Sequence, residues 1–471
     1  MTDLTNDTIA AIITAPGIGA MGALRLSGPA AFAAAARVFR SKRGRLMEEL
    51  GDYSLTYGGI YAGDCFLDQA LLLKMKGPHS FTGEDVAELQ CHGGPVVLGR
   101  LMETLTSWPD LPIKPAQPGE FSQRAFLNGK MDLSQAEAVM ELVSASNQKA
   151  AGLAAEQIEG ALSRRISQLK SRLLNLLASI EVDVDFPDEG LGDREGAKSW
   201  SRQLRQILAD TAELLAAANL GKIYREGLRI VFYGRPNAGK SSLLNGILQE
   251  PRAIVTPEPG TTRDTLEERI LLKGIPLVLT DTAGIRETGS QAEKAGVDRA
   301  RQMALKADLV LYIVDMQEGI TAEDRDLLTE LDKARTLIVF NKMDLIEEDK
   351  TGTMTAEDMN EAGFEDWQCC RLSALDPHSL EILAKHIKSF FETGRHYRQS
   401  QEILLNRRQE EALLKSKTAL EAALAVFEKG WPEDMAAIDL KQAWSALGEL
   451  TGETVQPALV EEIFSRFCLG K

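Results

Sequence analysis

The stretch that decides the fold in the middle of this chain is Gly-Arg-Pro-Asn-Ala-Gly-Lys-Ser, at residues 234–241. An apolar, strand-like segment (228–233) precedes it, and a helix-like segment begins at Ser242. This is the pattern G-x-x-x-x-G-K-S in the strand, loop and helix context that a phosphate-binding loop requires. Its glycines let backbone N–H groups converge on phosphates, Lys240 neutralises their charge, and Ser241 offers a hydroxyl to magnesium. We therefore predict a P-loop nucleotide-binding domain.

Two further motifs indicate that the base is guanine. Asp-Thr-Ala-Gly at 281–284 follows an apolar segment, so its aspartate can hold magnesium through water and its glycine amide can sense a γ-phosphate. Asn-Lys-Met-Asp at 341–344 follows another apolar segment, and Ser-Ala stands at 373–374. The Asp344 carboxylate can accept both the ring N–H and the exocyclic amine of guanine, a pair that adenine lacks. The sequence therefore predicts a G domain that binds GTP.

The first switch segment is expected at 256–264, where a threonine hydroxyl would complete the magnesium shell. A solvated polar loop is the simpler alternative for this segment taken alone. The predicted GTP-binding residues are Asn237, Ala238, Gly239, Lys240, Ser241, Ser242, Thr256, Thr261, Thr262, Asp281, Thr282, Ala283, Gly284, Asn341, Lys342, Asp344, Ser373 and Ala374.

One residue that many regulatory GTPases use is missing. Ile285 follows the motif at 281–284, where those proteins have the glutamine that orients the attacking water. Two replacements are open: a carboxylate further along, for which we favour Glu293, or a monovalent cation held by Asn237 and carbonyls of the first switch. Glu293 read alone could equally be a solvated helix charge.

Length and composition describe an ordinary globular protein. A chain of 471 residues with 44% hydrophobic and 26% charged residues suggests roughly three domains. Five cysteines without C-x-x-C spacing argue against a disulfide framework or a thiolate metal site. The amino terminus lacks a signal-like basic region and no apolar run approaches ~18 residues, so we expect a cytoplasmic protein with no membrane partner. The net charge of −16 means that RNA binding would need a local basic patch or a basic partner.

Hydrophobic patterning divides the chain into parts. Residues 8–119 alternate short apolar stretches with glycine and proline, as in an α+β domain, and residues 121–180 indicate long amphipathic helix. Helical pattern resumes after Gly394, so we expect the G domain to be inserted into one discontinuous helical domain. The predicted fold class is multidomain α/β plus all-α. The predicted domains are 1–120, 121–226 (helical, first part), 227–392 (G domain) and 393–471 (helical, second part).

These motifs together resemble the MnmE family, also called TrmE, of tRNA modification GTPases. The most specific stretches lie outside the generic GTP-binding motifs. They are Phe-Thr-Gly-Glu-Asp at 81–85, Pro-Gly-Glu-Phe-Ser at 118–122, Arg-Ala-Phe-Leu-Asn at 124–128, Gly-Thr-Thr-Arg-Asp at 260–264 and Cys-Leu-Gly-Lys at 468–471. The family usually has isoleucine where this chain has Leu469. The resemblance implies an N-terminal folate-binding and dimerisation domain, a helical domain, and an inserted Ras-like P-loop G domain.

The resemblance also implies how GTP would be hydrolysed. Two G domains of a homodimer would meet, and potassium would stand where an arginine finger acts in other GTPases. Glu293 would orient water as a catalytic residue. Magnesium would be held by Ser241 and Thr262, and potassium by Asn237, Thr256, Glu258 and Thr261.

The implied reaction adds an aminomethyl or carboxymethylaminomethyl group to C5 of the wobble uridine of certain tRNAs. The partner would be the MnmG flavoprotein, which carries FAD, in a heterotetramer. A tetrahydrofolate derivative would supply the one-carbon unit, bound by Arg25, Glu88, Lys130 and Lys471, with Cys468 as a catalytic thiol. Without the resemblance, surface ion pairs and a buried terminal cysteine would be the simpler readings. The tRNA contacts would fall on basic clusters such as 164–165 or 407–408.

Two other functions fit the same motifs. The chain could be a regulatory GTPase, such as a ribosome-assembly switch, whose N-terminal domain is only an interaction module. It could also be a scaffold whose GTP state locks a dimer without modification chemistry. The regulatory GTPase predicts no folate binding and no dependence on Cys468. For the scaffold, Glu293→Ala would weaken hydrolysis but leave tRNA modification intact.

Overall fold

The structure is a computed structural model, and it describes residues 7–185, 194–248, 268–279, 301–345, 367–376, 378–392 and 403–470. The chain forms two compact units. The first contains residues 1–143, 155–209 and 411–471, and the second contains residues 144–154 and 210–410. None of the helices in the described ranges is long and apolar enough to cross a membrane.

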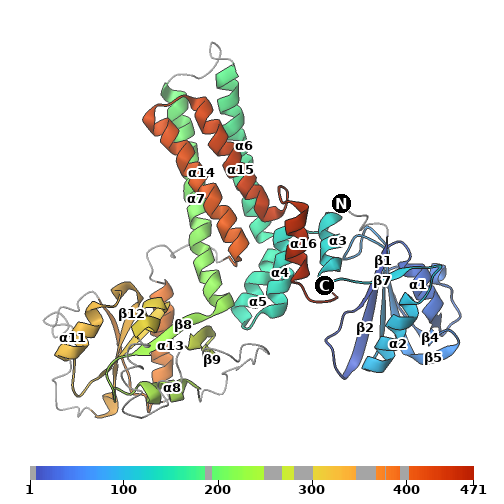
Figure 1. Cartoon of the computed structure of the whole chain (residues 1–471), viewed down its shortest axis with the longest axis horizontal. Coiled ribbons are helices and arrows are strands. Elements are labelled where there is room, and N and C mark those ends of the chain that lie inside the picture. Colours follow the sequence, from blue (N-terminus) through green and yellow to red (C-terminus); the bar gives the residue numbers. More distant parts are fainter. Residues whose placement is uncertain are drawn as a thin grey trace. The chain divides into compact units, whose positions relative to one another are not determined.

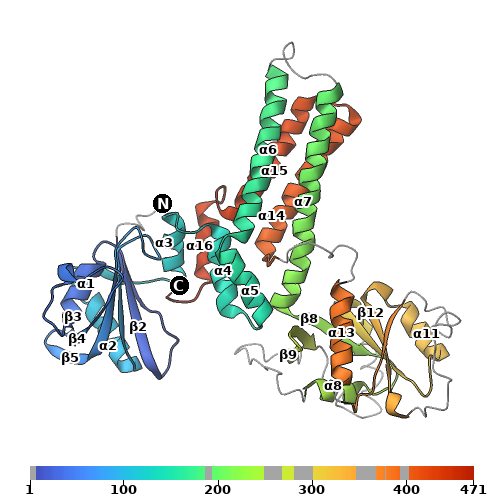
Figure 2. The same ribbon diagram turned by 180° about the vertical axis from the view of Figure 1, so that it is seen from behind.

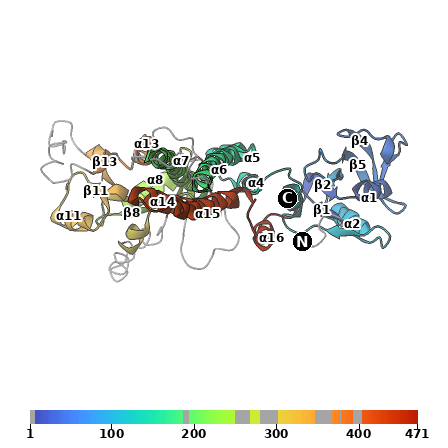
Figure 3. The ribbon, with the colours of Figure 1, turned by 90° about the horizontal axis from the view of Figure 1, so that it is seen from above.

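The first unit begins with a seven-stranded sheet in the order β3-β4-β5-β6-β2-β1-β7. Its strands are β1 (Thr8–Ile12), β2 (Gly19–Ser27), β3 (Phe39–Ser41), β4 (Leu55–Ala62), β5 (Cys65–Met75), β6 (Val86–Gly93) and β7 (Ile113–Pro115). Neighbouring strands are antiparallel except β1 and β7. Helices α1 (Ala31–Val38) and α2 (Pro95–Thr106) lie on one side of this sheet (Figures 1 and 3). A short 3₁₀ turn, η1, spans Met47–Glu49.

Side-chain alternation divides this sheet into two faces. Leu24 and Leu26 of β2 belong to the core under α1 and α2. Arg25 lies between them in sequence, so its side chain projects to the other face. There Ile9 and Ala11 of β1 pack with Phe121.

Helices make up the rest of the first unit and part of the second. They are α3 (Glu120–Leu127), α4 (Leu133–Ser144), α5 (Gln148–Ile158), α6 (Ala161–Asp185), α7 (Arg194–Glu226), α14 (Arg407–Lys429), α15 (Glu433–Thr451) and α16 (Pro457–Ser465). In α6 the buried residues recur at three- and four-residue steps: Leu162, Ile166, Leu169, Leu173, Leu176, Leu177 and Ile180. Figures 1 and 2 show α6, α7, α14 and α15 side by side in a bundle, with α6 packed on α15.

The long helix expected over 121–180 is in fact four helices, α3 to α6. Two of the breaks contain glycines in the left-handed region: Gly129 has φ 65° and Gly160 has φ 83°. Such a φ ends an α-helix without the steric cost that a side chain would add. The sequence pattern located the helical region correctly but not its division.

The second unit contains a six-stranded sheet in the order β13-β12-β11-β8-β10-β9. Its strands are β8 (Leu228–Tyr233), β9 (Glu268–Leu272), β10 (Ile275–Leu279), β11 (Leu309–Asp315), β12 (Thr336–Asn341) and β13 (Gln368–Arg371). All neighbouring strands are parallel except β9 and β10. Every residue of β11 and β12 is buried, as expected for parallel strands with both faces covered.

Helices cover both faces of this second sheet. On one face, α8 (Lys240–Leu248) and α13 (Ser379–Glu392) contribute Leu243, Ile247, Leu383 and Ile387 to the core (Figure 2). On the other face, Leu328 of α11 (Ala322–Thr329) packs with residues of β8, β11 and β12. The short 3₁₀ turns η2 (Lys333–Arg335) and η3 (Met343–Leu345) flank β12. The predicted fold class is confirmed: an α+β N-terminal part, a helical part and a P-loop α/β part.

Candidate functional site

The P-loop connects β8 to α8 through three residues in the left-handed region. Gly234 has φ 130°, Asn237 has φ 63° and Gly239 has φ 97°. A Cβ on Gly234 would collide with the carbonyl oxygen of Ile313, and one on Gly239 would collide with the side-chain amide of Asn341. Only glycine therefore fits at either position, and the loop can curl so that its N–H groups face a bound phosphate.

Lys240 begins α8 and folds back over this loop. Its Nζ donates to the carbonyl oxygens of Gly234 at 2.7 Å and Arg235 at 2.6 Å. Burial lowers the pKa of the Lys240 ammonium to about 8, because the charged form is desolvated. Ser241 and Ser242 follow at the exposed N-terminal turn of α8. This arrangement suits an anion, which would supply the opposite charge that the lysine needs.

The predicted base-recognition residues meet at the carboxyl end of β12. Asn341 donates from Nδ2 to the carbonyl oxygen of Ala238 at 3.0 Å, and its Oδ1 accepts the N–H of Ala374 at 2.9 Å. Ser373 Oγ donates to Asp344 Oδ1 at 2.5 Å. Asp344 is exposed, so its carboxylate is accessible to a base. Asn341 thus ties the phosphate loop directly to the loop that presents Asp344.

Lys342, the remaining predicted residue of this motif, pairs with a partner that the sequence did not reveal. Its Nζ lies 2.6 Å from Asp315 Oδ2, and its backbone has φ 66°. Asp315 is the last residue of β11, and β11 pairs in parallel with β12. An aspartate at the end of an apolar strand is the signal that could have identified it, because the carboxyl ends of parallel strands share one edge of the sheet.

The sequence also gave no sign that Arg235 of the P-loop has a structural role. Its Nε donates to Asp324 Oδ2 at 3.0 Å, and its Nη2 lies 2.8 Å from Glu318 Oε2. Asp324 is fully buried in α11 and accepts the hydroxyl of Tyr312 at 2.8 Å. Burial, together with this carboxylate, raises the pKa of Tyr312. No local sequence signal joins these residues, since 89 positions separate Arg235 from Asp324.

A second cluster of predicted residues lies on the N-terminal sheet, on the face opposite α1 and α2. Arg25 of β2 donates from Nε to Glu88 Oε1 of β6 at 2.8 Å, and the two residues are partners in the strand register. The Arg25 guanidinium also lies 5.4 Å from the ring centroid of Phe81 and 5.5 Å from that of Phe121. Both charged side chains are largely buried, at 18% and 11% exposure. A ligand here would meet a cation, a carboxylate and two aromatic rings.

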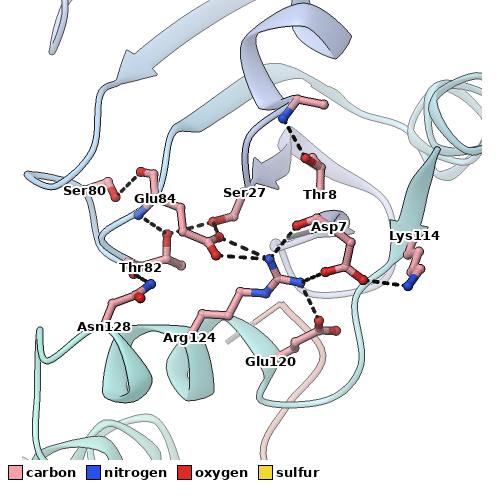
Figure 4. Close-up of polar contacts among 11 residues, drawn as sticks. Asp7, Thr8, Ser27, Ser80, Thr82, Glu84, Lys114, Glu120, Arg124 and Asn128 are labelled. Atoms are coloured by element: carbon pink, nitrogen blue, oxygen red, sulfur yellow. Dashed lines mark hydrogen bonds and ion pairs between the residues drawn. The ribbon is translucent and has the colours of Figure 1, made fainter. Parts of the chain in front are cut away.

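Arg124 organises the polar residues beside this cluster (Figure 4). Its guanidinium contacts Asp7 at 2.6 Å, Glu120 at 2.9 Å and Glu84 at 3.2 Å, and its side chain is 1% exposed. Glu84 also accepts the hydroxyl of Ser27 at 2.6 Å. The network therefore joins β2, the loop before β6 and α3. Those same elements carry Arg25, Phe81 and Phe121.

The other residues predicted for this site lie around α3 and the end of the chain. Cys468 is exposed, and its carbonyl oxygen accepts the N–H of Gly119 at 3.4 Å. Gly470 has φ 89°, and a Cβ there would lie 3.0 Å from the carbonyl oxygen of Ile12. Lys130 is exposed, and its Nζ donates to the carbonyl oxygen of Pro78 at 2.9 Å. The carboxyl-terminal segment thus packs beside α3 and the end of β1.

Comparison with known proteins identifies the family. The model of the MnmE helical domain matches residues 133–468, and the model of the GTP-binding protein TrmE N-terminus matches residues 8–130. The chain belongs to the MnmE family. Curated members of the MnmE family are similar over the whole length. The tRNA modification GTPase MnmE of Clostridioides difficile is 40% identical over 469 residues, which is 99% of each chain.

Two further comparisons concern a second MnmE relative and one solved structure. The tRNA modification GTPase MnmE of Symbiobacterium thermophilum is 41% identical over 468 residues, again 99% of each chain. A solved structure of Aquifex aeolicus Era bound to GDP and tetrafluoroaluminate is 24% identical, covers 41% of this chain and 66% of its own, and has a TM-score of 0.27. The chain is a GTPase of the MnmE family.

Several predicted site residues of this MnmE-family chain lie outside the described residues. They are Thr256, Glu258, Thr261, Thr262, Asp281, Thr282, Ala283, Gly284, Glu293 and Lys471. Among the residues that the structure describes, no group of three or more His, Cys, Asp and Glu side chains could hold a metal ion. Ser241 fits magnesium as a single hydroxyl ligand beside the phosphate loop, because Mg²⁺ in such sites keeps waters and phosphate oxygens as its other ligands.

Proposed function

We propose that this GTPase acts in tRNA modification and that, with the flavoprotein MnmG, it adds an aminomethyl or carboxymethylaminomethyl group to C5 of the wobble uridine. The observation that carries the proposal is the position of Asn341, which bonds both to Ala238 of the P-loop and to Ala374 of the base-recognition loop. Similarity to curated tRNA modification GTPases over 99% of the chain supports extending the role beyond the G domain.

In this proposal the nucleotide site spans the carboxyl ends of β8 and β12. Lys240 and the N–H groups of residues 237–242 bind the phosphates of GTP. Asp344 accepts two hydrogen bonds from guanine, and its bond from Ser373 orients the carboxylate for that task. Thr256, Thr261, Thr262 and residues 281–284 complete the site around the γ-phosphate.

Two cations and one carboxylate take part in hydrolysis in this proposal. Magnesium binds to Ser241 and Thr262. Potassium binds to Asn237 and to Thr256, Glu258 and Thr261, where it offsets the charge that develops in the transition state. The exposed, left-handed Asn237 is compatible with a cation ligand at the rim of the P-loop. Glu293 orients the attacking water.

The N-terminal sheet holds the one-carbon donor in this proposal. Arg25 and Glu88 fit a tetrahydrofolate derivative, because the carboxylate can accept N–H groups of a pterin and the guanidinium can bind an anion. The flanking Phe81 and Phe121 rings offer apolar surface for a planar ring system. Lys130 and Lys471 add positive charge for the glutamate tail. The bound folate would supply the one-carbon unit, and Cys468 would act as a nucleophilic thiol beside it.

We further propose four chain segments: 1–120, 121–226, 227–392 and 393–471. The start of β8 at Leu228 and the end of α13 at Glu392 support an inserted G domain. The proposed assembly is a homodimer that joins MnmG in a heterotetramer. Binding of tRNA by the clusters at 164–165 or 407–408 is also a proposal, since the net charge of −16 requires local basic contacts.

The first experiment compares GTP hydrolysis in potassium with that in sodium at equal ionic strength. A large potassium-specific acceleration that is lost in Asn237→Ala is the expected result, because potassium would take the place of an arginine finger while Glu293 orients the water. Equal rates in both salts would contradict cation-assisted hydrolysis and favour a regulatory switch.

A second experiment tests the modification chemistry. Glu293→Ala should bind GTP but lose both hydrolysis and tRNA modification, whereas Cys468→Ser should hydrolyse GTP and lose only modification. Modification that survives in Glu293→Ala would favour a scaffold that needs only the GTP state.

A further inference from the structure

One segment of the G domain contacts both ends of the candidate nucleotide site. We call residues 315–324, which link β11 to the first turn of α11, the β11–α11 connector. It begins with a tight turn in which the carbonyl oxygen of Asp315 accepts the N–H groups of Glu318 at 3.2 Å and Gly319 at 2.9 Å. Three of its four acidic side chains, Asp315, Glu318 and Asp324, pair with residues of the nucleotide motifs.

At the base end, Asp315 holds Lys342. The Lys342 Nζ lies 2.6 Å from Asp315 Oδ2, and the Asp315 side chain is 10% exposed. The other carboxylate oxygen, Oδ1, accepts the N–H of Gln317 at 2.9 Å, so the carboxylate itself is oriented. A free lysine side chain has much rotamer entropy to lose on binding a ligand. Pairing with Asp315 orders the Lys342 stem beforehand.

At the phosphate end, Asp324 and Glu318 hold Arg235. Asp324 Oδ2 accepts a hydrogen bond from Arg235 Nε at 3.0 Å, and Glu318 Oε2 lies 2.8 Å from Arg235 Nη2. Asp324 is fixed in turn by the Tyr312 hydroxyl at 2.8 Å and by the N–H of Thr321 at 2.9 Å. Arg235 supplies one of the two carbonyl oxygens that bind Lys240, so this ion pair fixes backbone that touches the phosphate-binding lysine.

We propose that the β11–α11 connector is a positioning element that preorganises both ends of the nucleotide site. Asp315 acts through Lys342 on the guanine base. Asp324 and Glu318 act through Arg235 on the phosphates. These are positioning residues, because each acts through another side chain, and their effect is to lower the ordering cost of binding. The inference rests on the guanine-nucleotide site proposed above.

The test uses the full chain and two ligands that each occupy one end of the site. Guanosine and inorganic tripolyphosphate displace N-methylanthraniloyl-GDP, and their inhibition constants are compared. Asp315→Asn should lower the affinity for guanosine about tenfold, which corresponds to the loss of one charge-assisted hydrogen bond. It should change the affinity for tripolyphosphate by less than about twofold. Arg235→Gln should instead lower the affinity for tripolyphosphate and leave the affinity for guanosine nearly unchanged. Asp315→Glu should recover part of the guanosine affinity, because it restores the charge.

Asp326→Asn is the matched control, since Asp326 is an exposed aspartate of α11 near Asp324. It should leave both constants unchanged. If Arg235→Gln fails to fold, Glu318→Gln replaces it as the test variant, because Glu318 is 59% exposed and its substitution should not disturb folding. Glu318→Gln should lower the affinity for tripolyphosphate and leave the affinity for guanosine unchanged. If the variants lose affinity for both ligands equally and also have a lower melting temperature, the connector is only structural, and the inference is overturned.

The two proposals fail in different ways. A wild-type chain that does not bind N-methylanthraniloyl-GDP would contradict the proposed nucleotide site itself. A wild-type chain that binds it, with guanosine affinity unchanged in Asp315→Asn, would overturn only the role of the connector.

Discussion

Asn341 and Ala238 are 103 residues apart in the chain, yet the Asn341 side-chain amide donates to the Ala238 carbonyl oxygen at 3.0 Å in a buried contact. The same side chain accepts the N–H of Ala374 at 2.9 Å. One amide thereby connects the loop that faces the phosphates with the loop that faces the base. We expect the geometry of the proposed nucleotide site to depend on this connection.

Asn341→Ala should lower the affinity for GDP by a factor corresponding to about 1–3 kcal/mol, because it leaves a buried carbonyl and a partly buried N–H without this partner. Isothermal titration calorimetry measures the change. Asn341→Asp is the informative companion variant, because it keeps the acceptor for Ala374 but places an oxygen against the Ala238 carbonyl. If Asn341→Asp binds GDP as wild type does, the bond to Ala238 contributes nothing to the site.

We expect Lys240 to make nucleotide binding dependent on pH. Its pKa in the ligand-free chain is lowered to about 8 by burial, and a bound phosphate should raise it again. Binding above pH 8 must therefore take up a proton, so GDP affinity should fall between pH 7 and 8.5, by at most about tenfold per pH unit. Titrations in buffers with different ionisation enthalpies report the proton uptake.

The control for this prediction is Lys240→Arg, whose guanidinium stays charged over the same range. It should bind GDP more weakly at pH 7 and show no proton uptake at pH 8.5. Absence of proton uptake in the wild-type chain at pH 8.5 would show that Lys240 is already charged there.

Arg124→Met should strongly destabilise the N-terminal sheet. The variant removes a buried cation and leaves the carboxylates of Asp7, Glu84 and Glu120 without their shared partner (Figure 4). Breaking a buried ion pair from one side costs about 3–5 kcal/mol. Hydrogen exchange at the amides of β2 and α3 measures this change locally. Arg100→Met is the control, because Arg100 pairs with Glu103 on an exposed helix surface and its loss should leave the exchange unchanged.

Lowering the pH should weaken the ion-pair network around Arg124, because protonation removes the charge of Asp7. The pKa of Asp7 is lowered below 3.8: burial opposes this, but hydrogen bonds from Lys114 and Arg124 and their positive charges outweigh it. A carboxyl whose pKa is lower in the folded chain than in the unfolded chain stabilises the fold. This stabilisation is fully present at a pH above the unfolded-state pKa and is lost as the pH falls through the folded-state pKa. The stability difference between wild type and Asp7→Asn should therefore be constant from pH 7 to 5 and shrink below about pH 4. Urea unfolding at each pH measures it, and a difference that does not change with pH would contradict the role of the Asp7 charge.

Local motifs allowed much of the nucleotide site to be predicted from the sequence. The P-loop depends on neighbouring residues, because Gly234, Asn237 and Gly239 set the backbone of one short loop. The base-recognition motif is equally local, at the end of β12. Periodicity also indicated the helical parts, although the left-handed glycines at 129 and 160 divide the first of them into separate helices.

By itself, the amino-acid sequence determined the phosphate loop and the class of each region and predicted the guanine-recognition motif, since these depend on residue types at short fixed spacings. Tertiary structure alone decided which charged side chains from distant parts of the chain meet. Arg235 meets Asp324, Lys342 meets Asp315, and Arg124 gathers Asp7 and Glu84, because strand order and helix packing bring distant positions together. No local motif pairs such residues, because the sequence around one partner does not specify the other.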